Sequence, residues 1–95
     1  MIVLVVHYTV HPGTEGQAAE YIRKMQENTR REPGCRLYFG HQAIDNPRRF
    51  LFYEQYDSRA ALVAHRAAPY FEQNITNGLA KLAESINREL FELVE

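Results

Sequence analysis

The strongest constraint on the fold is the segment at residues 2–10 (IVLVVHYTV), which consists mostly of β-branched and aromatic residues. Such residues favour an extended strand. Successive side chains of a strand point to opposite faces. One face would carry Ile2, Leu4, Val6, Tyr8 and Val10, and the other Val3, Val5, His7, Thr9 and His11. Because both faces are largely apolar, the pattern predicts a central strand covered on both sides.

A turn and a helix are predicted after this strand. Pro12 and Gly13 suit the central positions of a type II turn, and residues 14–17 (TEGQ) fit the capping-box pattern that starts a helix. The positions that recur at helical spacing on the inner face are Ala18, Ile22, Met25 and Thr29. Residues 32–34 (EPG) should stop this helix, since Pro disfavours helical geometry at Glu32 and Gly34 permits positive φ.

Two further strands are predicted at residues 35–44 and 49–56, joined in a hairpin by the loop 45–48 (DNPR). With a four-residue loop, His41 would pair with Phe52. One face of the hairpin would then carry Leu37, Phe39, His41, Phe50, Phe52, Glu54 and Tyr56. Paired residues project to the same face, so this grouping depends on the register.

Helices are predicted next, one capped by Ser58 and a second that starts at Pro69. The apolar stripe of the second helix comprises Phe71, Ile75, Leu79, Leu82 and Ile86. The tail at residues 89–94 is interpreted as a last strand. The resulting order, strand–helix–strand–strand–helix–strand, is the split βαβ or ferredoxin-like α+β fold over a single domain, residues 1–95.

In this topology a four-stranded antiparallel sheet carries its helices on one face only. Strands that are apolar on both faces would leave the second face bare, and a sheet-to-sheet homodimer is the simplest way to cover it. The sequence therefore predicts a homodimer.

Composition excludes several functions. Eleven basic against twelve acidic residues give a formal net charge of −1, which argues against nucleic acid as a partner. The opening apolar run is too short for a signal segment or a membrane span, and the lone Cys35 suits a reducing cytoplasm. No predicted helix carries two histidines at i, i+4 as a helical zinc site requires, since His7 and His11 lie on a predicted strand, and there is no Gly-rich phosphate loop. We therefore expect a cytoplasmic protein that has no metal site and no membrane span.

Several motifs together resemble the antibiotic biosynthesis monooxygenase (ABM) domain family. They are residues 31–35 (REPGC), 45–47 (DNP) and 52–56 (FYEQY), followed by Leu62, His65, Pro69 and Phe71. Their order and spacing extend over nearly the whole chain. Within the family, the hairpin and the His65 segment are similar to small quinol monooxygenases and to the isomerase that processes phosphorylated autoinducer-2.

The resemblance implies a dimeric α+β barrel that oxygenates a small quinol or hydroxylated aromatic with dioxygen and needs no cofactor, neither metal nor flavin. The positions that match the family's polar pattern are Glu54, Tyr56 and His65. His65 would be the base or would stabilise the substrate anion, and Tyr56 and Glu54 would orient it. Substrate-binding positions on the pocket wall would be His41, Phe39, Phe52 and Phe71.

Two other functions remain open. An isomerase or lyase of a small phosphorylated carbonyl compound would use the same histidines to move protons without oxygen, and a basic anchor such as Arg36 or Arg66 in the pocket would favour it. A non-catalytic dimeric module would only bind hydrophobic metabolites. Oxygen uptake separates the first function from both alternatives.

Overall fold

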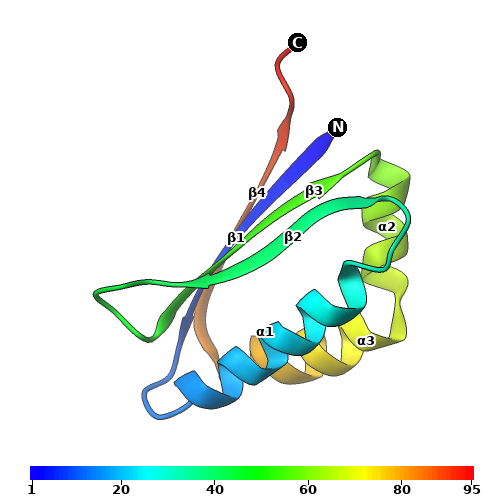
Figure 1. Cartoon of the computed structure of the whole chain (residues 1–95). Coiled ribbons are helices and arrows are strands. Elements are labelled where there is room, and N and C mark those ends of the chain that lie inside the picture. Colours follow the sequence, from blue (N-terminus) through cyan, green and yellow to red (C-terminus); the bar gives the residue numbers. More distant parts are fainter.

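The computed structural model describes all residues from 1 to 95. Four strands, β1 (Ile2–Val10), β2 (Cys35–Gln42), β3 (Arg49–Tyr56) and β4 (Ala83–Glu92), form one antiparallel sheet in the order β2-β3-β1-β4. The helical elements are α1 (Glu15–Thr29), α2 (Arg59–Ala67), α3 (Pro69–Phe71), the π-helical η1 (Glu72–Leu79) and α4 (Ala80–Leu82). All of them lie on one side of the sheet (Figure 1). This is the predicted ferredoxin-like arrangement.

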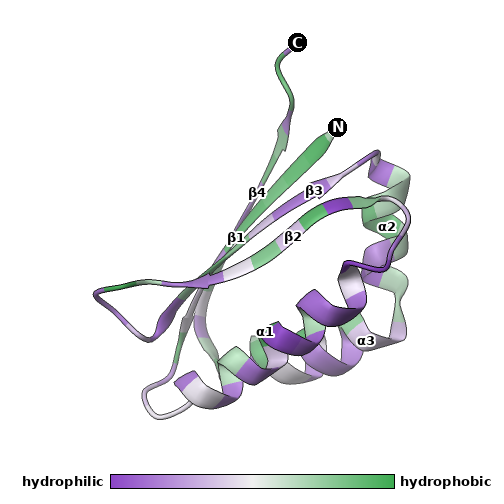
Figure 2. Ribbon diagram, in the orientation of Figure 1, coloured by the Kyte–Doolittle hydropathy of each residue, from purple (hydrophilic) through white to green (hydrophobic).

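Strand β1 is central, as its sequence predicts, and pairs with β3 on one side and β4 on the other. Its helix-facing side chains, Ile2, Leu4, Val6, Tyr8 and Val10, are all buried in the core. Figure 2 shows the contrast between this strand, hydrophobic along most of its length, and the largely hydrophilic α1. Within one chain, only the helix-facing side of β1 is covered.

The start of α1 agrees with the sequence in position but not in its capping. Gly13 has φ of +88°, and the Thr14 N–H donates to the His11 carbonyl at 3.2 Å, as in the predicted turn. The predicted capping box is wrong. The Thr14 hydroxyl donates to the carbonyl of His11, and the Glu15 carboxylate accepts from the Gly13 N–H. Both side chains therefore stabilise the turn rather than the first helical N–H groups.

The β2–β3 hairpin differs from the prediction by one residue in register. His41 pairs with Leu51, and the Ala43 N–H donates to the Arg49 carbonyl, so the loop is longer than the expected 45–48. Phe39 and His41 consequently lie on the face opposite to Phe52. The predicted shared face is therefore wrong for Leu37, Phe39 and His41, and Tyr38 takes the buried position.

The C-terminal strand begins earlier than predicted. Residue Ile86, expected on a helix, pairs with Tyr8 within β4, because helical geometry ends at Leu82 and Ala83 is already extended. Pairing along β4 satisfies the backbone groups of an edge of β1 that would otherwise lack partners. The other two helix starts are as expected, with the Ser58 hydroxyl accepting the Ala61 N–H and Pro69 opening α3.

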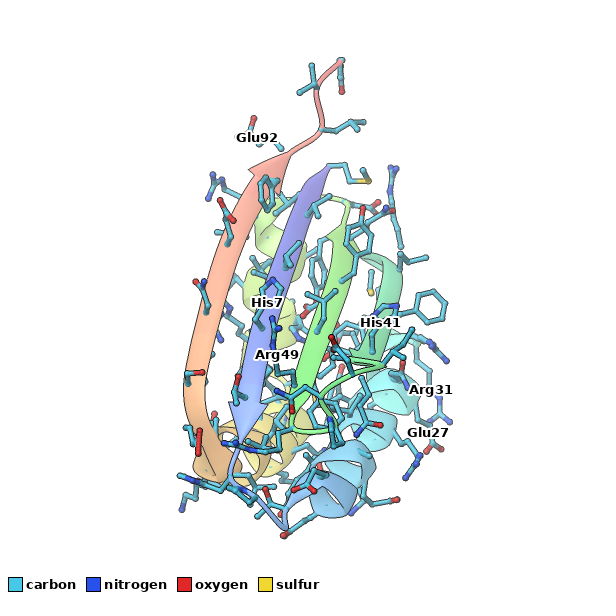
Figure 3. The ribbon with its side chains drawn as sticks, turned by 90° about the vertical axis from the view of Figure 1, so that its left-hand side faces the viewer. His7, Glu27, Arg31, His41, Arg49 and Glu92 are labelled. Atoms are coloured by element: carbon cyan, nitrogen blue, oxygen red, sulfur yellow. The ribbon has the colours of Figure 1, made fainter.

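The sheet face that points away from the helices has no cover within the chain (Figure 3). It carries Val3, Val5, Leu37, Leu51, Tyr53 and Phe91 together with His7, Phe39, His41 and Arg49. We call this surface the open face. None of the helices is both long and apolar enough to cross a membrane.

Candidate active site

The candidate active site lies between the helices and the sheet. Glu54 and Tyr56 alternate onto the helix-facing side of β3 and are buried there. His65 follows Leu62 by three residues on the inner side of α2 and is only 2% exposed. The ring centroids of His65 and Tyr56 are 5.4 Å apart. The three residues that the family pattern singles out are therefore neighbours in space.

His65 is held between two carboxylates. Its Nδ1 is 3.0 Å from Oε2 of Glu32, and its Nε2 is 3.9 Å from Oε1 of Glu54. A neutral imidazole has one N–H and one lone pair, and the hydrogen bond made by one nitrogen sets the state of the other. With Nδ1–H donating to Glu32, Nε2 is left as the proton acceptor on the side of Glu54.

The surroundings of His65 keep its ring neutral. Burial lowers the pKa of His65 below its ordinary value, and this effect outweighs the hydrogen bond and the charge of Glu32, which raise it. The rings of Tyr38, Tyr56 and Phe71 lie 5.3 to 5.6 Å from the imidazole, centroid to centroid. A neutral imidazole with a fixed orientation can act as a general base.

Glu54 and Tyr56 form a second hydrogen-bonded pair. The Tyr56 hydroxyl donates to Oε1 of Glu54 at 2.5 Å. Burial raises the pKa of Glu54 to about 7, despite the opposing effects of Tyr56 and of two arginines, Arg88 and Arg66. Burial and the nearby Glu54 raise the pKa of the Tyr56 hydroxyl far above its ordinary value. Tyr56 therefore stays a donor, while Glu54 can exchange a proton near neutral pH.

The sequence analysis missed two residues on the Nδ1 side of His65, Glu32 and Tyr70. The Glu32 carboxylate accepts from the Tyr70 hydroxyl as well as facing His65. In the sequence, Glu32 served only to end a helix, although it lies in the REPGC motif on which the family resemblance rests. Its position in that motif was the signal that could have identified it. Nothing comparable marks Tyr70.

A small cavity of about 10 Å³ adjoins these residues, on the order of the space that one water molecule needs. Its lining comprises Leu4, Val6, Tyr8, Tyr38, Phe52, Glu54, His65, Arg66, Phe71, Ile75 and Arg88. Phe52 and Phe71, two of the predicted substrate-binding residues, are in this lining. The cavity thus combines aromatic walls, a base, a carboxyl group and two guanidinium groups.

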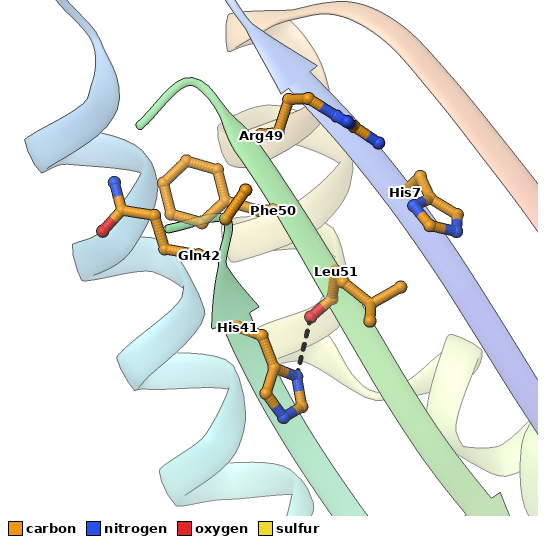
Figure 4. Close-up of a pocket in the computed structure, with 7 residues that line it drawn as sticks. His7, His41, Gln42, Arg49, Phe50 and Leu51 are labelled. Carbon is orange, nitrogen blue, oxygen red and sulfur yellow. Dashed lines mark hydrogen bonds between the residues drawn. The ribbon is translucent and has the colours of Figure 1, made fainter. Parts of the chain in front are cut away.

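The other two predicted binding residues, Phe39 and His41, lie on the open face. Phe39 packs under the guanidinium of Arg30, 4.5 Å from the ring centroid. His41 lines a separate hollow of about 230 Å³ with His7 and Arg49 (Figure 4), and its Nδ1 is 3.2 Å from the Leu51 carbonyl oxygen. The one-residue change in register is what separates them from His65.

Known proteins share both the fold and the sequence pattern. Residues 1–76 match the family model described as antibiotic biosynthesis monooxygenase. The chain is 28% identical to the uncharacterized protein sll1783 of Synechocystis over 94 residues. This alignment covers 99% of the present chain but only 64% of the Synechocystis protein.

Two crystal structures superpose on nearly the whole chain. One is described as an antibiotic biosynthesis monooxygenase and has a TM-score of 0.93, 24% identity and full coverage of both chains. The other, SO0527 from Shewanella oneidensis, has a TM-score of 0.88 and 28% identity, and the match covers 95% of this chain and 87% of that one. The ferredoxin-like fold and the match to the family model thus place the protein in a known class. The chain belongs to the antibiotic biosynthesis monooxygenase family.

Proposed function

We propose that this protein is a cofactor-independent monooxygenase that acts on a small quinol or hydroxylated aromatic. The observation that carries the proposal is His65, a buried imidazole held at Nδ1 by Glu32 with Nε2 available toward an aromatic-lined cavity. An imidazole in this state can take the proton of a phenolic hydroxyl group. Family membership makes oxygenation the first chemistry to test.

The reaction draws all of its electrons from the substrate. His65 Nε2 removes a hydroxyl proton, and the resulting electron-rich anion passes an electron to dioxygen. Recombination forms one C–O bond, the ring carbon releases its hydrogen as a proton, and cleavage of the O–O bond releases the second oxygen atom as water. One quinol and one dioxygen thus give one hydroxyquinone and one water.

The neighbouring residues have defined parts in this scheme. Glu54, with a pKa of about 7, accepts the second proton and delivers it to the departing oxygen. Tyr56 fixes the orientation of Glu54 through its hydrogen bond. The cavity must widen to admit a quinol, and Phe52 and Phe71 in its lining would then contact the ring and keep water away from the anion.

We further infer that the protein works as a cytoplasmic homodimer and that residues 1–95 act as a single domain. A second copy packed on the open face would bury its apolar side chains and produce the α+β barrel. Within each chain, Glu32, Glu54, Tyr56 and His65 already lie together at the candidate site.

One observation favours the alternative of an isomerase or lyase for a phosphorylated carbonyl compound. Arg66, one of the two anchors named from the sequence, lines the His65 cavity. Arg36, the other, pairs instead with Asp57 at the surface. Proton transfer by His65 and Glu54 would serve that reaction without oxygen, so oxygen consumption is the measurement that separates the two enzymes.

The test is oxygen uptake by the purified protein with a panel of quinols, with product analysis. We expect one dioxygen per quinol, a hydroxyquinone as product and no hydrogen peroxide. His65→Gln should lower the rate 10²- to 10⁴-fold, the usual range for loss of a general base. His11→Gln is the matched control, because His11 is exposed at the turn before α1, away from the cavity.

Glu32→Gln provides a second variant if His65→Gln does not fold. It should lower both the rate and the pKa of His65, which can be followed by NMR, because Glu32 raises that pKa. Oxygen uptake no faster than quinol autoxidation across the panel would contradict the proposal. Conversion of a phosphorylated carbonyl compound without oxygen would establish the isomerase, and tight binding without any turnover would establish the non-catalytic module.

A further inference from the structure

Two arginines reach the candidate active-site cavity from different parts of the chain. Arg66 directly follows His65 on α2, and Arg88 lies on the helix-facing side of β4, where it pairs across the sheet with Val6. Both line the cavity that contains Glu54 and His65. The fold therefore gathers two guanidinium groups at the site of the proposed base.

Neither arginine has a carboxylate partner. The arginines that form salt bridges within 4.0 Å are Arg23, Arg31, Arg36, Arg48 and Arg59, all with carboxylates outside the cavity. Arg66 and Arg88 form none, and Glu54, the carboxyl group that shares their cavity, is engaged by the Tyr56 hydroxyl instead. Both arginines are exposed to solvent, so their guanidinium groups are free of ion pairs within the chain.

The electrostatics of the cavity agree with this geometry. Arg88 and Arg66 both act to lower the pKa of Glu54, and Arg88 also acts to lower that of Tyr8, although burial dominates and raises the two values to about 7 and about 12. The charges of both guanidinium groups thus act on ionisable side chains inside the cavity. The Glu54 carboxyl is partly protonated near neutral pH, so it opposes an incoming anion only in part.

We propose that Arg66 and Arg88 bind an anionic group of the substrate, a carboxylate or a phosphate, while its reactive part lies beside His65. The cavity has room for about one water molecule as it stands, so the exposed side chains of Arg66 and Arg88 must move outward when the substrate enters. The planar guanidinium group matches both anions through paired N–H donors. The inference rests on the proposed function in one respect, since it takes the His65 cavity as the substrate site. It narrows the substrate class to compounds that carry an acidic group.

Anaerobic binding measurements test this anchor independently of turnover. Gentisate and hydroquinone share the same quinol ring and differ by one carboxylate, and dihydroxyacetone phosphate supplies the phosphate on a carbonyl compound. We expect at least one anionic probe to bind about tenfold more tightly than hydroquinone. The tighter of the two anions identifies the source of the charge.

Arg66→Gln and Arg88→Gln should each raise the Kd of that anionic probe about 10- to 100-fold, the effect of removing one charge-assisted hydrogen bond. The Kd of hydroquinone should change less than twofold. Arg23→Gln, on the exposed side of α1, is the matched control and should leave both values unchanged. Circular dichroism verifies that each variant is folded.

The inference is overturned if neither anion binds better than hydroquinone, or if Arg23→Gln weakens anion binding as much as the two cavity variants do. Failure of the proposed function is a different outcome. In that case the anions bind in an arginine-dependent manner, but no oxygen is consumed with any quinol.

Discussion

Glu54 and His65 are buried ionisable side chains whose protonation affects stability in opposite directions. Burial raises the pKa of Glu54 and lowers that of His65. The folded protein therefore retains the Glu54 proton to higher pH than the unfolded chain does, whereas it releases the His65 proton at lower pH. Between its unfolded and folded pKa values, each side chain is therefore neutral in the folded protein but charged in the unfolded chain. Such shifted pKa values are common in catalytic acid–base pairs.

Glu54→Gln should stabilise the protein at alkaline pH. Between the ordinary pKa of 4.5 and the folded value of about 7, folded Glu54 binds more protons than the unfolded residue. The free energy of unfolding of the wild type therefore falls as pH rises through this window. Gln keeps the acceptor for the Tyr56 hydroxyl but does not ionise. We expect the variant to equal the wild type at pH 4 and to exceed it by up to about 3 kcal/mol at pH 8.

Urea denaturation at pH 4, 6 and 8 measures this difference. Glu27→Gln serves as the control, because Glu27 is exposed on α1 and its effect should not vary with pH in the same way. A Glu54→Gln effect that is constant from pH 4 to pH 8 would show that Glu54 ionises normally in the folded state. Oxygen uptake by the same variant should fall, since the second proton acceptor is lost.

At the scale of elements, the sequence predicts which segments are strands better than it predicts their register. Tyr38 and Phe39 are adjacent aromatic residues, so either could face the helices, and the hydrophobic pattern does not decide between the two registers. The choice is made by the long loop after Gln42 and by the approach of α1 to Gly40. Neither is visible in a local pattern.

In the candidate site, too, local sequence signals place some residues and tertiary contacts place the others. Glu54 and Tyr56 can be placed together from the sequence because they are two residues apart on one strand, and His65 follows from its motif. Glu32, Tyr70 and Arg88 come from distant segments and meet the site only through tertiary packing. Residues that join the site through long-range contacts therefore could not be predicted from the sequence.

The packing of α1 against β2 predicts opposite effects for two glycine substitutions. A Cβ on Gly40 would overlap Cγ2 of the buried Ile22, and the ring of Phe52 lies 3.4 Å away on another side. Gly40→Ala should therefore lower the free energy of unfolding by about 1–3 kcal/mol. Gly16→Ala, in the first turn of α1 with nothing within 4 Å of the new Cβ, should raise it by about 0.5–1 kcal/mol. Thermal or urea unfolding measures the free energy of unfolding of both variants. Equal changes in the two variants would contradict the close approach of α1 to Gly40.

At the scale of the whole molecule, the open face leaves apolar side chains of the sheet without cover within the chain (Figure 3). Val3, Val5, Leu37, Leu51 and Tyr53 form an apolar area across three strands, and β4 adds Phe91, which is 44% exposed. A contiguous apolar surface of this kind marks an interaction site. A second copy of the same surface, related by a twofold axis, is complementary in polarity and satisfies closed symmetry.

Tyr53→Glu should dissociate the proposed dimer. Tyr53 lies on β3 between Val5 and Phe39, in the middle of the open face, so a carboxylate there would be buried between two sheets without a partner. Light scattering at micromolar concentration should give about twice 11.1 kDa for the wild type and about 11.1 kDa for the variant. Val63→Glu is the matched control, because Val63 is 67% exposed on α2, on the helical side of the molecule, and this variant should remain dimeric. A monomeric wild type, or a Tyr53→Glu variant that stays dimeric, would remove the open face as the interface.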